Sequence, residues 1–217
     1  MTSDSACVVA VFAKAAVPGA VKTRLSPQIG ANGAARLHLA LVRQALQTAL
    51  EAQIGCVQLW STAEDPALSG IAATLDVDLR LQTGGDLGQR MSHTFADLLA
   101  TTRSVILVGS DCPSRSAQDL REASVQLASG CDAVLGPTED GGYHLIALNR
   151  MLPSVFIDID WSTPAVLEQT RARLRTLRLR WHELPLRWDV DRPEDLARLR
   201  ADPRHAKLAA EADGTLT

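Results

Sequence analysis

What the chain lacks excludes several classes of protein. Its four cysteines are far apart and form no C-x-x-C pair, which excludes a disulfide framework and a zinc knuckle and favours the reduced thiols of a cytoplasmic protein. The apolar run behind the polar first residues is much shorter than the roughly 20 residues that span a bilayer. We therefore expect neither a signal peptide nor an anchor, a cytoplasmic location, and no membrane partner.

The sequence also has no excess of positive charge. The formal net charge is -3 at pH 7, so no overall field attracts nucleic acid, and any anion site must be built locally. The arginine run at residues 171–180 has leucines at the spacing of a helix face and then of an alternating strand. This pattern indicates a solvated face, and we expect no nucleic-acid partner.

No linker and no internal repeat divides the chain. Its 217 residues, 46% of them hydrophobic, are enough for one sizeable core. We expect a single domain over residues 1–217, with its core at about 7–200 and a tail at 201–217. The tail after Pro203 is predicted to be a helix that frays.

Short apolar runs alternate with segments of helical spacing. The expected strands of the first half are residues 7–13, 56–61, 77–82, 104–110 and 132–137. In the second half we expect strands at 143–148, 155–158 and 177–190, and helices at 164–173 and 193–200. Because parallel neighbours need crossover connections, the alternation predicts an α/β fold, a mostly parallel sheet with helices on both faces.

The segment after the first expected strand resembles a phosphate cradle. It carries the turn formers Pro18 and Gly19 and the cations Lys14, Lys22 and Arg24. If residues 22–24 are extended, alternation points Lys22 and Arg24 the same way, toward one polyphosphate. The alternative is a surface loop of solvated cations. The sequence is not a Walker A motif, and no G-x-G-x-x-G follows a strand.

Acidic residues mark a candidate metal site. Asp111 follows the expected strand 104–110, and ligands of open α/β sheets bind beside the carboxyl ends of strands. Magnesium is usually held by one or two carboxylates plus substrate phosphates. Asp189 and Asp191 alternate along an extended stretch, and we favour Asp191 as the second ligand. The alternatives are a turn-capping role for Asp111 and an N-cap role for Asp191. A nucleophilic role for Cys112 has little support.

Glycine-rich turns form a second group of candidates. Glu139, Asp140, Gly141 and Gly142 lie between two apolar runs, which indicates either backbone packed against a ligand or a hairpin turn. Residues 82–91 precede a helix with a capping-box pattern, and a helix N-terminus attracts anions. The loop at 158–163 combines acids, hydroxyls and Trp161, which suits an acceptor pocket or the core.

Six segments in this order resemble one known family. They are FAKAAVPGAVKTRL, GDLGQRM, GSDCP, GPTEDGGYHLIAL, DIDWST and DVDRPEDL, and the match covers roughly residues 8–199. They are similar to the transferase 1 family associated with radical-SAM and selenium-domain genes. That family has the GT-A-like fold of the nucleotide-diphospho-sugar transferase superfamily, so the resemblance implies a three-layer α/β/α sandwich with a mixed sheet.

The resemblance implies roles for the candidate residues. Lys22, Arg24 and Asp111 would be catalytic, and Asp111 and Asp191 would bind Mg²⁺ or Mn²⁺. The nucleotide would contact Ala13, Lys14, Gly19, Lys22, Arg24, Gly85, Asp86 and Arg90, and the acceptor Glu139, Asp140, Gly141, Gly142, Trp161, Ser162 and Thr163. The chain departs from the family pattern at Ala16, His144 and Asp160.

Three functions stay open at this point. The family implies glycosyl transfer from a nucleotide sugar to a small-molecule acceptor. However, GT-A glycosyltransferases usually show Asp-x-Asp, whereas the loop here is Asp111-Cys112-Pro113, and both this loop and KTRL also resemble phospholactate and molybdenum-cofactor guanylyltransferases. Nucleotidyl transfer from a nucleoside triphosphate is therefore the alternative. A nucleotide-binding regulator without turnover is the third. The sequence does not fix the oligomeric state, and a homodimer is one of the states left open.

Overall fold

The computed structural model describes residues 7–214. The polar first residues 1–6 and the end of the predicted tail, 215–217, lie outside the described residues. The strands are β1 Cys7–Ala13, β2 Cys56–Ser61, β3 Asp78–Leu81, β4 Ser104–Gly109, β5 Ala133–Pro137, β6 Tyr143–Leu148 and β7 Trp181–Glu183. The helices are α1 Ser26–Ala52, α2 Pro66–Leu75, α3 Leu87–Leu99, α4 Ala117–Ala128, α5 Val166–Thr176, α6 Pro193–Ala201 and α7 Ala206–Asp213, with 3₁₀ turns η1 Pro153–Phe156 and η2 Pro203–His205.

All these strands belong to one mixed sheet in the order β3-β2-β1-β4-β6-β5-β7. The first four are parallel, β6 is antiparallel to β4 and β5, and β7 is parallel to β5. Every residue of the central β1 is buried, as expected for a parallel strand covered on both faces. The predicted α/β class and the mostly parallel sheet are confirmed.

Two predicted strands are wrong or too long. The strand expected at 155–158 is the 3₁₀ turn η1, which begins at Pro153, and the ring of Phe156 stacks on Phe95 at a centroid distance of 5.7 Å. The strand expected at 177–190 is reduced to β7 and a single bridge between Thr138 and Arg187. Pro185 lies within that stretch and cannot donate to a sheet ladder, so pairing stops before it.

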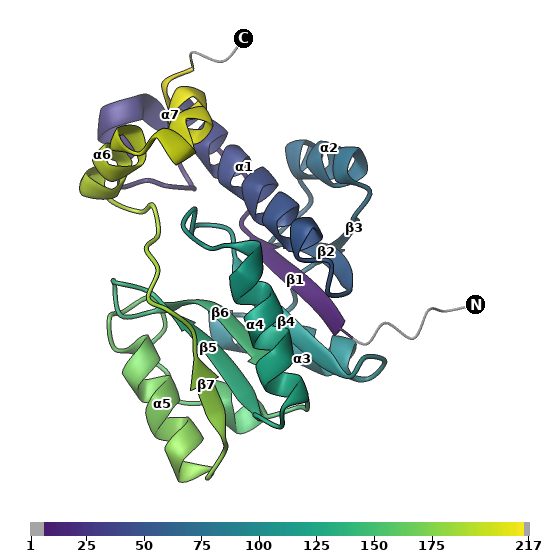
Figure 1. Cartoon of the computed structure of the whole chain (residues 1–217). Coiled ribbons are helices and arrows are strands. Elements are labelled where there is room, and N and C mark those ends of the chain that lie inside the picture. The colour runs from purple at the N-terminus through teal and green to yellow at the C-terminus, as the bar shows by residue number, and fades with distance from the viewer. Residues whose placement is uncertain (1–6, 215–217) are drawn as a thin grey trace.

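Helices cover both faces of the sheet and make the α/β/α layers (Figure 1). Apolar residues of α1, α2 and α4 pack on one face, and those of α3, α5 and η1 on the other. None of the helices in residues 7–214 combines the length and the apolar character needed to cross a bilayer.

A third, smaller core lies beyond the sheet, where α6 and α7 pack beside the start of α1 (Figure 1). Leu25, at the end of the predicted phosphate loop, and Val190, between the two acids of the predicted acidic segment, are both fully buried in this core. The helix predicted after Pro203 is present as α7, and its Leu208 and Ala212 are buried in the same cluster. This core therefore holds two candidate segments against each other.

Candidate functional site

The loop after β1 is folded into turns, not extended. Lys22 has a left-handed backbone with φ of 48°, a conformation that costs about 1–3 kcal/mol for a non-glycine residue and is often found at functional sites. The expectation that residues 22–24 alternate along an extended segment is therefore wrong. Lys22 and Arg24 nevertheless reach the same carboxylate, because the turn brings both side chains toward Asp191.

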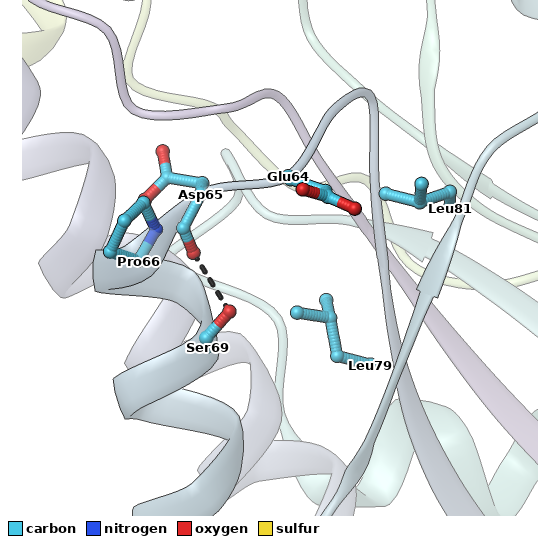
Figure 2. A pocket seen from close by; sticks show the side chains of 6 residues that line it. All are labelled: Glu64, Asp65, Pro66, Ser69, Leu79 and Leu81. Carbon is cyan, nitrogen blue, oxygen red and sulfur yellow. Dashed lines mark hydrogen bonds between the residues drawn. The ribbon is translucent and has the colours of Figure 1, made fainter.

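The start of α2 holds this loop in place. The Asp65 carboxylate accepts a hydrogen bond from the Ala16 backbone N–H through Oδ2, at 2.6 Å. Through Oδ1 it accepts from the backbone N–H groups of Ala67 and Leu68 and so caps the helix. Figure 2 shows Asp65 at the first turn of α2. Asp65 was not among the predicted site residues, although an aspartate before a proline that opens a helix is a recognised start signal.

A buried histidine fixes the backbone at Lys14. His38 of α1 is 3% exposed, and its Nε2 donates to the Lys14 carbonyl at 2.9 Å. Burial is the largest influence on its pKa and lowers it, although the nearby charge of Asp111 opposes the shift. A neutral ring can donate to a carbonyl through one nitrogen, which fits this contact. His38 was also missed, since it lies within the apolar face of a helix.

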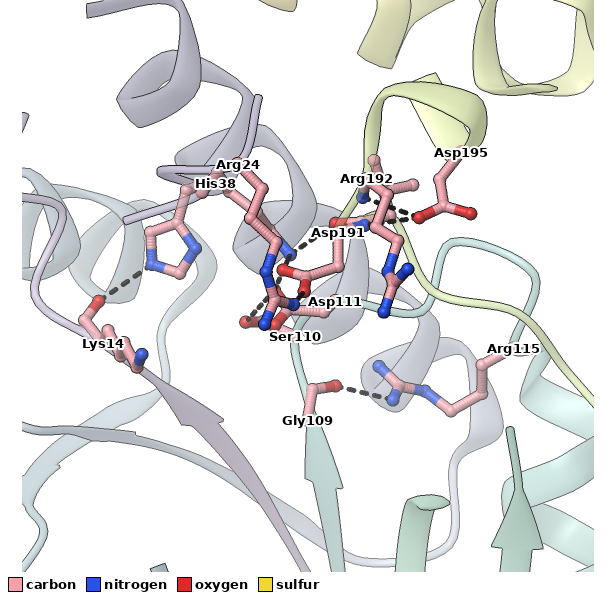
Figure 3. Close-up of polar contacts among 12 residues, drawn as sticks. Lys14, Arg24, His38, Gly109, Ser110, Asp111, Arg115, Asp191, Arg192 and Asp195 are labelled. Atoms are coloured by element: carbon pink, nitrogen blue, oxygen red, sulfur yellow. Dashed lines mark hydrogen bonds and ion pairs between the residues drawn. The ribbon is translucent and has the colours of Figure 1, made fainter. Parts of the chain in front are cut away.

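Lys22 contacts both candidate metal-binding acids, Asp111 and Asp191, which Figure 3 shows beside Arg24. Its ammonium Nζ is 2.8 Å from Oδ1 of Asp111 and 4.0 Å from Oδ1 of Asp191, and it donates to the Val190 carbonyl at 2.6 Å. The Arg24 guanidinium forms an ion pair with the other oxygen of Asp191. The structure thus brings together four of the predicted site residues from three distant segments.

The alternative N-cap role of Asp191 is wrong, because the N-cap of α6 is Arg192 and the Asp191 carboxylate is used by the two cations. Asp195 instead accepts from the backbone N–H groups of Asp191 and Arg192 at the start of α6. The helix is capped from within its first turn. The Asp191 side chain is thereby free to face the loop after β1.

Asp111 is kept ionised by its neighbours. Burial raises the pKa of its carboxyl, but the Lys22 ammonium, followed by the His38 ring, outweighs burial and holds the pKa below its ordinary value. Its side chain is 49% exposed, and that of Asp191 is 46% exposed. Both carboxylates can therefore meet a ligand from solvent while they contact the buried lysine.

Asp189 has a different environment. Burial, reinforced by the negative charges of Asp140 and Asp111, raises its pKa to about 8. No hydrogen bond or ion pair joins its side chain to a cation among residues 7–214, whereas Asp191 has two. Of the two acids left open by the sequence, Asp191 is the one beside Asp111 and Lys22.

The end of β4 is anchored by a buried arginine that the sequence analysis missed. Arg115 is 4% exposed, and its Nη1 donates to the Gly109 carbonyl at 2.7 Å (Figure 3). It ties the last residue of β4 to the turn that carries Asp111. Cys112 between them is buried, and burial raises the pKa of its thiol, which agrees with the weak support for a nucleophile.

The predicted nucleotide residues at the start of α3 form hydrogen bonds among themselves and with their own helix. Asp86 caps α3 by accepting from the Gln89 backbone N–H at 2.8 Å, as the capping pattern predicts. No hydrogen bond or ion pair in the described part of the chain links Gly85, Asp86 or Arg90 to Lys22 or Asp111. Their contact with a nucleotide stays a prediction.

The predicted acceptor loop touches this helix start. A Cβ atom placed on Gly88 would lie 2.4 Å from Nε1 of Trp161, so only glycine allows the indole to pack there. Trp161 is partly buried against the second core cluster. Ser162 follows in a left-handed backbone with φ of 67°, and the Thr163 hydroxyl donates to the Asp160 carbonyl at 2.7 Å.

The segment between β5 and β6 is a hairpin turn, one of its two predicted forms. Gly141 has φ of 87°, and a Cβ there would lie 2.2 Å from the carbonyl oxygen of Pro164. The close approach at Gly141 is thus made by the chain itself. Asp140 accepts from the Gly142 backbone N–H at 3.0 Å, and Glu139 pairs with Arg198 at 2.9 Å.

His144, one of the three residues that depart from the family pattern, is not at the surface. The ring is 4% exposed, and burial, assisted by the charge of Arg115, lowers its pKa to about 3. Both ring nitrogens are buried without a hydrogen-bond partner among the described residues. His144 therefore lies beneath the site as a neutral core residue.

Asp111 and Asp191 suit a divalent cation whose other coordination positions are filled by a bound ligand. No group of three or more His, Cys, Asp or Glu side chains in residues 7–214 could hold a metal ion. Asp111 and Asp191, however, face one ammonium. Magnesium is commonly held by one or two carboxylates together with substrate phosphates and water, so this pair suits it.

The fold is shared with several solved transferases. A structure assigned by name to the nucleotide-diphospho-sugar transferases, from Desulfovibrio desulfuricans G20, is 30% identical with a TM-score of 0.82, covering 97% of this chain and 96% of that one. CMP:2-keto-3-deoxy-manno-octonic acid synthetase complexed with CTP is 13% identical with a TM-score of 0.60, covering 90% and 97%. Glucosyl-3-phosphoglycerate synthase from Mycobacterium tuberculosis, with Mn²⁺ and UDP, is 10% identical with a TM-score of 0.55, covering 98% and 81%.

No curated protein matches the chain by sequence. Residues 45–163, more than half of the chain, match the family described as "Uncharacterized protein conserved in bacteria (DUF2064)". The predicted GT-A-like architecture is confirmed by the structural neighbours, whereas the narrower family suggested by the motifs stays a prediction. The chain belongs to the DUF2064 family.

Proposed function

We propose that this protein is a divalent-metal-dependent transferase that moves a glycosyl group from a nucleotide sugar to a small acceptor. One observation carries the proposal: Lys22 from the loop after β1 contacts Asp111, and Asp191 lies beside them. Cations for a diphosphate and acids for its counter-ion meet at the carboxyl ends of parallel strands, where α/β sheets bind ligands. The name of the relative from Desulfovibrio desulfuricans supports the same reaction class.

The residues would share the work in the following way. Asp111 and Asp191 would hold Mg²⁺ or Mn²⁺, which neutralises charge on phosphate oxygens when bound. Lys22 and Arg24 would leave their carboxylate partners and bind the diphosphate, Arg24 through its planar fork and Lys22 as a point charge. The chain would thus stabilise the leaving nucleoside diphosphate by electrostatics.

The acceptor would lie toward the β5–β6 hairpin and the 158–163 loop. Asp140 lies close enough to Asp189 to raise its pKa, and Trp161 offers an apolar ring beside the start of α3. An indole packs well against the face of a sugar. Aligning the acceptor hydroxyl against the bound donor would add to the rate enhancement that the electrostatic groups supply.

The test is product analysis with purified protein. The protein is incubated with Mg²⁺ or Mn²⁺ and a panel of nucleotide sugars and nucleoside triphosphates, with and without pooled small acceptors. Release of nucleoside diphosphate that requires metal and is lost in Lys22→Met supports the proposal. If every ligand binds and no product forms, the protein is the non-catalytic regulator that the sequence left open.

Nucleotidyl transfer is the second candidate, on one specific observation. The turn after β4 supplies a single carboxylate, Asp111, because Pro113 stands where the second acid of an Asp-x-Asp motif would be. The second acid comes from a distant segment at Asp191. In the same assay, pyrophosphate released from a nucleoside triphosphate with a phosphorylated acceptor would select this reaction. We place either activity in the cytoplasm, because the four cysteines are far apart in the sequence and form no C-x-x-C pair.

A further inference from the structure

A hollow lies at the edge of the sheet, away from the charged cluster. It has a volume of about 560 Å³ and lies between the start of α2 and strand β3. Its lining is Glu64, Asp65, Pro66, Ser69, Leu79 and Leu81 (Figure 2). None of these residues has a role in the site described above, except that Asp65 holds the loop after β1.

The hollow is close enough to Lys22 and Arg24 for a single ligand to contact both the hollow and the cations. Asp65 lines it and also accepts from the Ala16 backbone, so the phosphate loop borders it directly. In the order β3-β2-β1-β4, Leu81 is three strand spacings from the end of β4, roughly 14 Å. A nucleoside with its diphosphate extended along the sheet edge spans such a distance.

The lining has one unused ionic group. The Asp65 carboxylate is occupied by three backbone N–H donors, and the Ser69 hydroxyl donates to the Asp65 carbonyl at 3.0 Å. The Glu64 carboxylate makes no hydrogen bond or ion pair with any residue in 7–214. Figure 2 shows it pointing across the space toward Leu81, with Leu79 below. The hollow thus offers three apolar side chains, Pro66, Leu79 and Leu81, and the two acceptor oxygens of Glu64.

We propose that this hollow binds the base of the nucleotide and that Glu64 selects guanine. The inference rests on the proposed function. A carboxylate accepts two parallel N–H bonds best, and the edge of guanine that carries N1–H and the 2-amino group presents such a pair. Adenine and cytosine place a ring acceptor beside their amino group, and uracil flanks its one N–H with carbonyls, so each would set an oxygen or nitrogen lone pair against Glu64. The same negative charge repels phosphate and directs it toward Lys22.

The test compares binding of GDP, ADP, UDP and CDP to the full chain with Mg²⁺ by titration calorimetry. GDP is expected to bind at least about 10-fold more tightly than the others, since a hydrogen bond to a charged group contributes about 1.5–3 kcal/mol. Glu64→Gln should weaken GDP about 10-fold and leave the other three unchanged. Lys22→Met should weaken all four alike, because they share the same phosphates.

A matched control and two contrary outcomes complete the design. Glu51→Gln removes an exposed carboxylate near the end of α1 and should change no affinity. Equal binding of the four nucleotides, or a preference that Glu64→Gln does not alter, overturns the guanine assignment and leaves the proposed function intact. If no nucleotide binds in the presence of Mg²⁺, the proposed function and this inference both fail.

Discussion

Replacing the acid at the end of β4 tests the centre of the site. The change Asp111→Asn keeps the size of the side chain and removes its charge. In the proposed metal site the two carboxylates are Asp111 and Asp191, so the variant would lose half of the negative charge of that site. Preorganised electrostatic groups of this kind are typically responsible for about 100-fold in rate or more, which corresponds to about 2.7 kcal/mol of transition-state stabilisation.

The same change should hardly affect folding. The ion pair with Lys22 is short, 2.8 Å, and the lysine is buried, but the Asp111 side chain is 49% exposed. Because the Lys22 ammonium keeps the Val190 carbonyl and Asp191 as partners and water screens the exposed carboxylate, we expect a loss of at most about 1 kcal/mol. Asparagine can still accept a hydrogen bond from Lys22. We expect the melting temperature to fall by no more than about 4 °C for a chain of this size.

The assay measures kcat/KM over a range of Mg²⁺ concentrations, together with thermal unfolding of the same preparation. The control is Asp213→Asn, which removes a surface ion pair with Arg200 and should leave turnover unchanged. Turnover of Asp111→Asn within threefold of the parent chain would refute the metal-ligand role. A large loss of melting temperature would instead refute the argument that the pair is screened.

Three further predictions concern stability. Gly141→Ala should lose about 1–3 kcal/mol or more, because the backbone is left-handed and a Cβ would overlap a carbonyl oxygen, whereas Gly70→Ala in the open surface of α2 should gain up to about 1 kcal/mol in urea unfolding. His144 has a folded pKa of about 3, below the unfolded value near 6.5. Between these pH values the unfolded chain binds a proton that the folded chain excludes. The free energy of unfolding should therefore fall as pH drops from about 6.5 toward 3, by up to about 1.4 kcal/mol per pH unit. His144→Leu should flatten that slope, and an unchanged slope would contradict the buried neutral ring. Asp119→Asn should cost about 3 kcal/mol, because it removes the negative charge and one of the two oxygens that accept from the partly buried Arg187, and a loss below 0.5 kcal/mol by urea unfolding would contradict this.

The regular elements could be predicted from the sequence wherever a local pattern determines them. Strand β6 has the predicted bounds, because an apolar run follows a glycine turn. The helix start at Asp86 was predicted from its capping pattern. The strand predicted at 155–158 is wrong, because three apolar residues in succession fit a buried 3₁₀ turn as well as a strand.

The candidate site was predicted only in its residue types. Lys22, Asp111 and Asp191 were identified from charge and position, but the left-handed turn that brings Lys22 to them has no local sequence signature. Arg115 and His38 hold the site through backbone carbonyls. Such contacts depend on tertiary packing, and neither residue stands out from its neighbours in the sequence.

The small core under α7 has a consequence for engineering the protein. Leu25 lies three residues from Lys22, and Val190 is next to Asp191. Both belong to the same hydrophobic cluster as Leu208. Deleting α7 would therefore remove packing that supports both Lys22 and Asp191, although the deletion would change neither residue. Fusion tags and crystallisation deletions at this terminus belong among the changes that need an activity check.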